Sequence, residues 1–200
     1  MSGPSDGGSV PRSIALASLP NLITLGRLLC VPVTVWLILN AYFGAAFWLC
    51  VAAGLSDAAD GFLAKQLRAK SELGAYLDPL ADKALLVSVF VTLGYAGVVA
   101  SWLVILIVFR DLLIVGGALV YATMTRTLRM QPLFISKLNT ALQIVLAAVL
   151  LARSAYGFAD GFVEILIHVV AATTILSGAA YVMKWGFSAA KLGEKPAAGE

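Results

Sequence analysis

The chain has 200 residues, of which 60% are hydrophobic and only 12% are charged, and its mean hydropathy is +0.93. Soluble domains usually carry about 25% charged residues, so this composition excludes an ordinary soluble domain. It predicts an all-α polytopic membrane protein, and six spans of roughly 20–25 residues would use most of the chain. The formal net charge of +3 does not distinguish between functions. The positions of the charged residues along the chain are more informative.

Six apolar stretches are expected to cross the bilayer. Pro20 precedes the first of them, near a first helical position where its missing N–H costs little. We expect a disordered N-terminal segment at residues 1–13, one membrane domain at 14–188 and a polar C-terminal tail at 189–200. The predicted transmembrane helices cover approximately residues 21–41, 42–65, 73–98, 102–124, 134–151 and 161–181.

The basic residues predict how these spans are oriented. If the N-terminus is cytoplasmic, nine basic residues fall in the inner segments and only Arg153 falls in an outer loop. Inner loops of membrane proteins carry an excess of Lys and Arg, so both termini are expected on the cytoplasmic side of a bacterial inner membrane or an equivalent membrane. The nine inner residues are Arg12, Lys65, Arg68, Lys70, Arg126, Arg129, Lys184, Lys191 and Lys195.

Four aspartates stand where the second predicted span ends and the third begins. They are Asp57, Asp60, Asp78 and Asp82. The spacings i, i+3 and i, i+4 put each pair on one face of a helix, and a short polar loop between two helices makes them antiparallel. Four converging carboxylates need compensating cations, and oxygen ligands favour Mg²⁺, Mn²⁺ or Ca²⁺ over zinc. The alternative is a solvated acidic helix–loop–helix outside the membrane, which the closely flanking apolar sequence disfavours.

Other polar residues lie inside the predicted spans. Arg27 is either functional or reaches the membrane surface with its long side chain. Arg110 and Asp111 are adjacent in the fourth span and point about 100° apart on a helix, so each is expected to pair with a different neighbour. The fifth span carries a polar stripe at helical spacing. Its members are Ser136, Asn139, Thr140 and Gln143.

The aspartate region resembles the signature of the CDP-alcohol phosphotransferases, D-x2-D-G-x2-A-[R]-x8-G-x3-D-x3-D. Seven of its eight positions match, and the departure is Lys65, which keeps the charge of the usual Arg but loses its bidentate fork. The matching positions are Asp57, Asp60, Gly61, Ala64, Gly74, Asp78 and Asp82.

The resemblance implies an enzyme with divalent cations, two Mg²⁺ or Mn²⁺ ions, and CDP-diacylglycerol as a substrate. It implies that Asp57, Asp60 and Asp78 are metal ligands and that Asp82 is a ligand or the general base. The implied nucleotide-binding residues are Asn21, Thr24, Gly61, Ala64, Lys65 and Gly74. A homodimer is expected from the resemblance alone.

Within this superfamily the chain resembles the eukaryotic-type cardiolipin synthases in four segments. They are NLITLGR (21–27), SDAADGF (56–62), LDPLADK (77–83) and PLFISKLNTALQ (132–143). Phosphatidylglycerophosphate synthases usually carry a second Lys where this chain has Asn139. A dianionic acceptor such as glycerol 3-phosphate would be better balanced by that extra positive charge. Phosphatidylglycerol is a monoanionic diester, so fewer cations suffice.

The resemblance therefore implies transfer of a phosphatidyl group to phosphatidylglycerol, giving cardiolipin and CMP. The expected acceptor pocket contains Arg110, Ser136, Lys137 and Asn139. Three alternatives stay open: a phosphatidylglycerophosphate synthase that uses glycerol 3-phosphate, an ion transporter with the aspartates as its path, and a scaffold that binds anionic lipid without chemistry. No nucleic-acid partner is expected.

Overall fold

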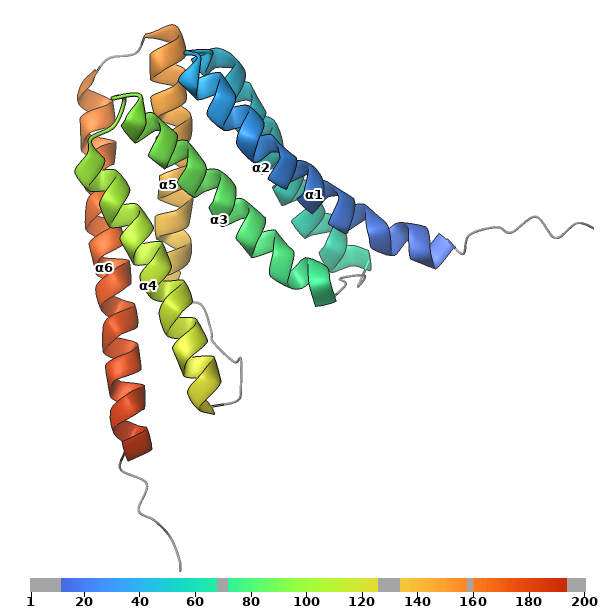
Figure 1. Ribbon diagram of the computed structural model, residues 1–200, viewed down its shortest axis with the longest axis vertical. Coiled ribbons are helices and arrows are strands. Elements are labelled where there is room, and N and C mark those ends of the chain that lie inside the picture. The colour runs from blue at the N-terminus through green and yellow to red at the C-terminus, as the bar shows by residue number, and fades with distance from the viewer. Residues whose placement is uncertain (1–11, 68–71, 126–133, 158–159, 194–200) are drawn as a thin grey trace, which may run out of the picture. The chain divides into compact units, whose positions relative to one another are not determined.

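The computed structural model describes the backbone of residues 12–67, 72–125, 134–157 and 160–193, and the side chains of residues 25–56, 83–117, 134–157 and 161–184. Within these ranges all regular secondary structure is helical, which confirms the predicted all-α class (Figure 1). The six helices are α1 (Arg12–Leu39), α2 (Phe43–Leu67), α3 (Glu72–Tyr95), α4 (Ser101–Thr125), α5 (Phe134–Tyr156) and α6 (Asp160–Gly193).

α1 and α6 extend furthest beyond their predicted ranges. α1 begins at Arg12, so Pro20 lies inside the helix, and the expectation that it opens the helix is wrong. The residues before Pro20 are mostly Ala, Leu, Ile and Ser, and the good helix formers among them allow the helix to start earlier. α6 continues to Gly193, beyond the apolar stretch that predicted it, because Ala and Lys also favour helix.

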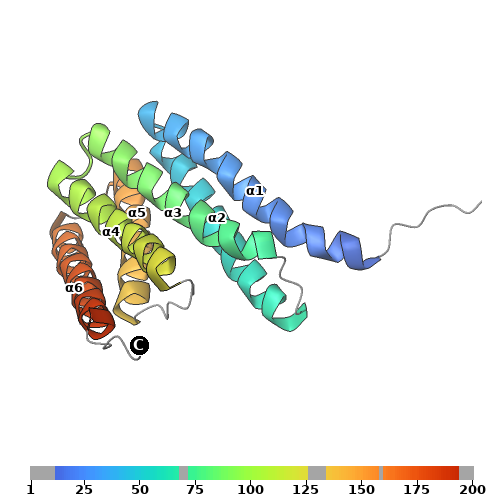
Figure 2. The same cartoon turned by 60° about the horizontal axis from the view of Figure 1, so that its bottom comes forward.

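The chain divides into two compact units, residues 1–88 and 89–200. In the first unit α1 packs against α2 (Figure 2). A tight turn joins the two helices: Ala41 takes a left-handed conformation with φ 58°, and the Tyr42 N–H donates to the Leu37 carbonyl over 2.8 Å. Ile38, Ala46 and Ala53 are buried in this unit.

In the second unit α6 packs against both α4 and α5 (Figure 2). Apolar side chains from these helices form its core, and the last turns of α3 add Phe90 and Leu93. A Cβ added to Gly94 of α3 would lie 2.8 Å from Cγ2 of Val104 on α4, so the absence of a side chain lets α3 and α4 approach closely. Fully buried apolar residues of α4–α6 include Leu103, Ile107, Leu146, Leu150, Leu151 and Val170.

Two helices are long and apolar enough to cross a membrane among the described residues. They are Phe134–Tyr156, with 23 residues, and Gly161–Lys184, with 24. Many large apolar side chains on these helices face outward, including Ile144, Ile165 and Leu176. Exposed apolar faces on such helices suit contact with lipid, and they agree with membrane association.

Candidate functional site

The aspartate pairs lie on two helices joined by a short connection. α2 is continuous through Asp57 and Asp60 to Leu67, and α3 runs from Glu72 through Asp78 and Asp82. The helical register assumed for both pairs is therefore confirmed, and each pair occupies one side of its helix. The four residues between the helices keep their ends within reach of each other.

The four aspartates of α2 and α3 are the residue type that an oxygen-donor metal site uses. Four aspartates flank a four-residue connection, and carboxylates are the ligands that Mg²⁺ and Mn²⁺ prefer. The side chains of residues 57–82 lie outside the described side chains, as do those of Asn21 and Thr24. Residues 57–82 include the predicted nucleotide-binding residues Gly61, Ala64, Lys65 and Gly74. Among the side chains that are described, no group of three or more His, Cys, Asp or Glu could hold a metal.

A buried polar cluster is built in the second unit around Arg110 of α4. Its side chain is 2% exposed. The guanidinium donates from Nε to the Ser177 hydroxyl of α6 over 3.1 Å, and from Nη2 to the Ser136 hydroxyl of α5 over 2.6 Å. Arg110 therefore links α4, α5 and α6 by hydrogen bonds. Its contact with Ser136 joins two residues of the predicted acceptor pocket.

Arg110 and Asp111 form an ion pair with each other, so the expectation that each would pair with a different neighbour is wrong. Nη1 of Arg110 lies 2.6 Å from Oδ1 of Asp111, and the two side chains are 2% and 8% exposed. The Arg side chain is long enough to fold back across the 100° between adjacent helical positions. In a buried environment two opposite charges gain most by meeting directly, so the cluster contains a cation that is already neutralised.

Replacement of Asp111 by Asn should destabilise the protein strongly. The change would leave the Arg110 cation buried without its countercharge, and breaking one partner of a buried pair costs about 3–5 kcal/mol. We expect a clear fall in the melting temperature of the purified protein in detergent.

The control is the double replacement of Arg110 by Met and Asp111 by Leu. Apolar replacement of both members of a buried ion pair is often neutral or stabilising, so the double variant should melt above the single variant. An Asp111→Asn protein that melts like the wild type would show that the pair does not hold the bundle together.

A second buried polar group lies around Asn139 on α5. Its carboxamide oxygen accepts hydrogen bonds from the hydroxyls of Thr173 and Thr174 on α6, both over 2.9 Å. Gln143 follows one turn later on the same helix, and both Asn139 and Gln143 are 0% exposed. The stripe predicted on the fifth span therefore faces α6 in part.

The remaining members of the predicted stripe and pocket lie differently. Thr140 donates to the Ser136 carbonyl of its own helix over 3.1 Å, and Lys137 is exposed. The structure thus brings Arg110 and Ser136 into direct contact and leaves Lys137 outside the buried cluster.

Residues 17–183 match the model of the CDP-alcohol phosphatidyltransferase family. The chain belongs to this family. Membership covers most of the sequence, and it includes α2 and α3 with their aspartates as well as the polar cluster of α4–α6.

Three relatives within the curated proteins have names that bear on the acceptor. A rice (Oryza sativa subsp. japonica) chloroplastic CDP-diacylglycerol–glycerol-3-phosphate 3-phosphatidyltransferase is 36% identical over 84% of this chain and 57% of its own length. Cardiolipin synthases (CMP-forming) of Rattus norvegicus and Homo sapiens are 36% and 35% identical, each over 82% of this chain and 60% of their own length. The chain therefore spans a little over half the length of these relatives.

The sequence analysis did not predict the polar residues that α6 contributes around Arg110 and Asn139. Thr173, Thr174 and Ser177 are small polar residues at positions i, i+1 and i+4 in an apolar helix, which single-sequence reading treats as ordinary span residues. Their spacing places them on adjoining positions of one helical face. That spacing, opposite a polar stripe in the preceding span, was the signal that could have found them.

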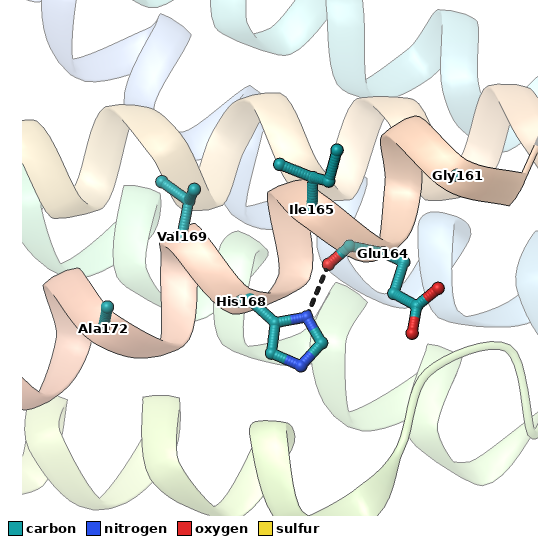
Figure 3. A pocket seen from close by; sticks show the side chains of 6 residues that line it. All are labelled: Gly161, Glu164, Ile165, His168, Val169 and Ala172. Atoms are coloured by element: carbon teal, nitrogen blue, oxygen red, sulfur yellow. Dashed lines mark hydrogen bonds between the residues drawn. The ribbon is translucent and has the colours of Figure 1, made fainter.

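A shallow hollow of about 520 Å³ lies elsewhere on α6 (Figure 3). Nδ1 of His168 lies 2.8 Å from the backbone carbonyl oxygen of Glu164 there. Both side chains are exposed, whereas Thr174 and Ser177 are buried, so this face is distinct from the polar cluster. The hollow is lined by Gly161, Glu164, Ile165, His168, Val169 and Ala172.

Proposed function

We propose that this chain is an integral-membrane enzyme that transfers the phosphatidyl group of CDP-diacylglycerol to phosphatidylglycerol, forming cardiolipin and releasing CMP. Membership of the CDP-alcohol phosphatidyltransferase family supports the reaction class. The rat and human relatives, whose names are cardiolipin synthase (CMP-forming), support the acceptor.

The observation that carries the choice of acceptor is the charge balance of the polar cluster. The Arg110 cation is already paired with Asp111 at 2.6 Å, and Asn139 is neutral. With Arg110 neutralised by Asp111, the Lys137 cation adds one positive charge to the assigned residues, which matches a monoanionic phosphodiester better than a dianionic acceptor such as glycerol 3-phosphate. We assign Arg110, Ser136, Lys137 and Asn139 to the acceptor site, with exposed Lys137 at its edge.

The residues of α2 and α3 would carry the chemistry. Asp57, Asp60 and Asp78 would hold two divalent cations, Mg²⁺ or Mn²⁺, with Asp82 as a further ligand or as the general base. The cations held by these carboxylates would supply positive charge against the pyrophosphate and against the charge developing on the attacked phosphorus. The acceptor hydroxyl would lose its proton to Asp82 as its oxygen bonds to the phosphorus that bears the lipid, and the bond from that phosphorus to CMP would break.

The nucleotide would lie beside these carboxylates. Gly61, Ala64 and Gly74 leave room for the cytidine end of the substrate because their side chains are small or absent. Lys65 would attract the pyrophosphate in place of the family's Arg. Asn21 and Thr24 on α1 would complete the nucleotide pocket.

We further propose six membrane spans with the aspartates on the cytoplasmic side of a bacterial inner membrane or an equivalent membrane. Exposed aromatic side chains stand near the connections α1–α2, α3–α4 and α5–α6, and aromatic residues favour the membrane–water interface. The excess of basic residues on the other connections supports the orientation. These aromatic residues are Tyr42, Tyr95, Trp102, Tyr156 and Phe162. A homodimer is proposed from the family resemblance.

The alternative product is phosphatidylglycerophosphate, formed with glycerol 3-phosphate as acceptor. The name of the rice relative favours it. The two reactions share CDP-diacylglycerol and CMP, so only the acceptor and the lipid product separate them.

The decisive experiment supplies the purified protein with CDP-diacylglycerol and either phosphatidylglycerol or glycerol 3-phosphate, and identifies the lipid product by mass spectrometry. We expect cardiolipin from phosphatidylglycerol and little product from glycerol 3-phosphate. Phosphatidylglycerophosphate without cardiolipin would overturn the acceptor and leave the reaction class standing. An absence of CMP release with every acceptor would instead favour a transporter or a lipid-binding scaffold.

A further inference from the structure

We propose that Asn139 and Gln143 form a neutral subsite that binds a hydroxyl group of the acceptor alcohol. The inference rests on the proposed transfer to an alcohol, and it adds Gln143, together with a defined role for Asn139, to the acceptor site. It is carried by two fully buried carboxamides: the Nδ2 group of Asn139 and both polar atoms of Gln143 lack hydrogen-bond partners among the described residues.

The carboxamide oxygen of Asn139 faces two hydroxyls of α6. Its oxygen accepts from the Thr173 and Thr174 hydroxyls, both at 2.9 Å. The Nδ2 group is placed away from these threonines, and it has no hydrogen-bond partner among the described atoms.

Gln143 extends the same arrangement by one helical turn. Its side chain is 0% exposed, and neither Nε2 nor Oε1 has a hydrogen-bond partner within the described part of the chain. Buried polar groups are nearly always hydrogen-bonded, and one that is not calls for an explanation. Two such carboxamides on successive turns of α5 indicate a place that a polar group occupies when the enzyme works.

The chemistry of these atoms selects the kind of group. Asn139 offers N–H donors, and Gln143 offers both N–H donors and an oxygen acceptor. A phosphate carries charge that two neutral carboxamides cannot balance, and a metal cation needs several oxygen ligands. A hydroxyl both donates and accepts one hydrogen bond without charge, so a hydroxyl matches the subsite.

The position along α5 suits an alcohol that also carries a phosphate. Ser136, which accepts from Arg110, is half-buried, while Asn139 and Gln143 are fully buried. A helix rises about 1.5 Å per residue, so Gln143 lies about 10 Å further along α5 than Ser136. An acceptor with its phosphate near Arg110 and Ser136 could extend a glycerol unit along this stripe. The headgroup of phosphatidylglycerol has two hydroxyls, and the one that does not react needs a neutral partner.

The test compares phosphatidylglycerol with a phosphatidyl-1,3-propanediol that lacks the secondary hydroxyl. For the wild-type protein we expect the analogue to have a kcat/KM lower by about tenfold or more, because a site built to bind a hydroxyl discriminates against an acceptor without it. Gln143→Leu should reduce kcat/KM for phosphatidylglycerol by a similar factor. The variant enzyme should then show about the same kcat/KM with both acceptors. The KM for CDP-diacylglycerol should stay within about twofold of the wild-type value.

The matched control is Leu146→Met, a change of similar size at a fully buried position on the next turn of α5. It should keep the wild-type preference for phosphatidylglycerol, because conservative apolar replacements disturb packing little. The melting temperature of Gln143→Leu should equal or exceed that of the wild type, because the change removes a buried polar group.

Two results would overturn the subsite. One is an unchanged kcat/KM in Gln143→Leu, which would leave an ordered water as the partner of these carboxamides. The other is a wild-type enzyme that uses both acceptors equally, and this measurement needs no variant to fold. If the wild-type acceptor proves to be glycerol 3-phosphate, the same comparison is made with 1,3-propanediol phosphate. The acceptor assignment can therefore fail while the hydroxyl subsite stands.

Discussion

Chelation of divalent cations by EDTA should abolish the release of CMP from CDP-diacylglycerol, and Mg²⁺ or Mn²⁺ should restore it. The proposed site contains four carboxylates, on α2 and α3, beside a pyrophosphate. These like charges repel one another unless cations compensate them, so the substrate should bind poorly and react negligibly in metal-free buffer. The measurement is CMP release before and after chelation, with each metal added back in turn.

A control with EDTA already saturated with Mg²⁺ separates chelation from any direct effect of the chelator, and activity should persist in it. A second readout is the melting temperature, because a ligand that binds only the folded protein stabilises it. Added Mg²⁺ should raise the melting temperature of the wild type and should do so less in Asp57→Asn. Full turnover in metal-free buffer would contradict the metal assignment of the aspartates.

Much of the fold follows directly from the sequence. Six apolar stretches predicted six helices, and the structure has six in the described residues, because long runs of helix-forming apolar residues favour this structure. The ends were harder to place. α1 starts at Arg12 and α6 ends at Gly193, since helix propensity continues where hydrophobicity stops.

The sequence predicted the aspartate helices well and the contacts of the α4–α6 polar cluster poorly. Spacing alone placed the aspartate pairs on helical faces, because the helical period is fixed. The pairing of Arg110 with Asp111 at 2.6 Å could not be read from spacing, because a long side chain can reach around the helix. The spacing of Thr173 and Thr174 marks them as a polar face, but their contacts with Asn139 depend on how α5 packs against α6, which spacing alone does not give.

Replacement of Asp82 by Asn should reduce turnover by about 10²–10⁴-fold if Asp82 is the general base, the range that general acid–base catalysis usually contributes. Asn has nearly the same shape as Asp but cannot take up the proton of the acceptor hydroxyl. Asp82 lies within α3, where the backbone is helical and accepts Asn without strain. The fold should therefore survive, and binding of CDP-diacylglycerol should change less than kcat.

The comparison with Asp78→Asn separates a base from a metal ligand, because Asp78 lies one turn earlier on the same helix. Loss of a ligand should raise the Mg²⁺ concentration required for half-maximal activity, whereas loss of the base should lower kcat at every Mg²⁺ concentration. We expect the first behaviour for Asp78→Asn. The second behaviour in Asp82→Asn would assign the proton transfer to Asp82, and the first would make Asp82 a ligand. A near-normal rate in Asp82→Asn would show that the base lies elsewhere and that the fourth aspartate is not needed for the transfer.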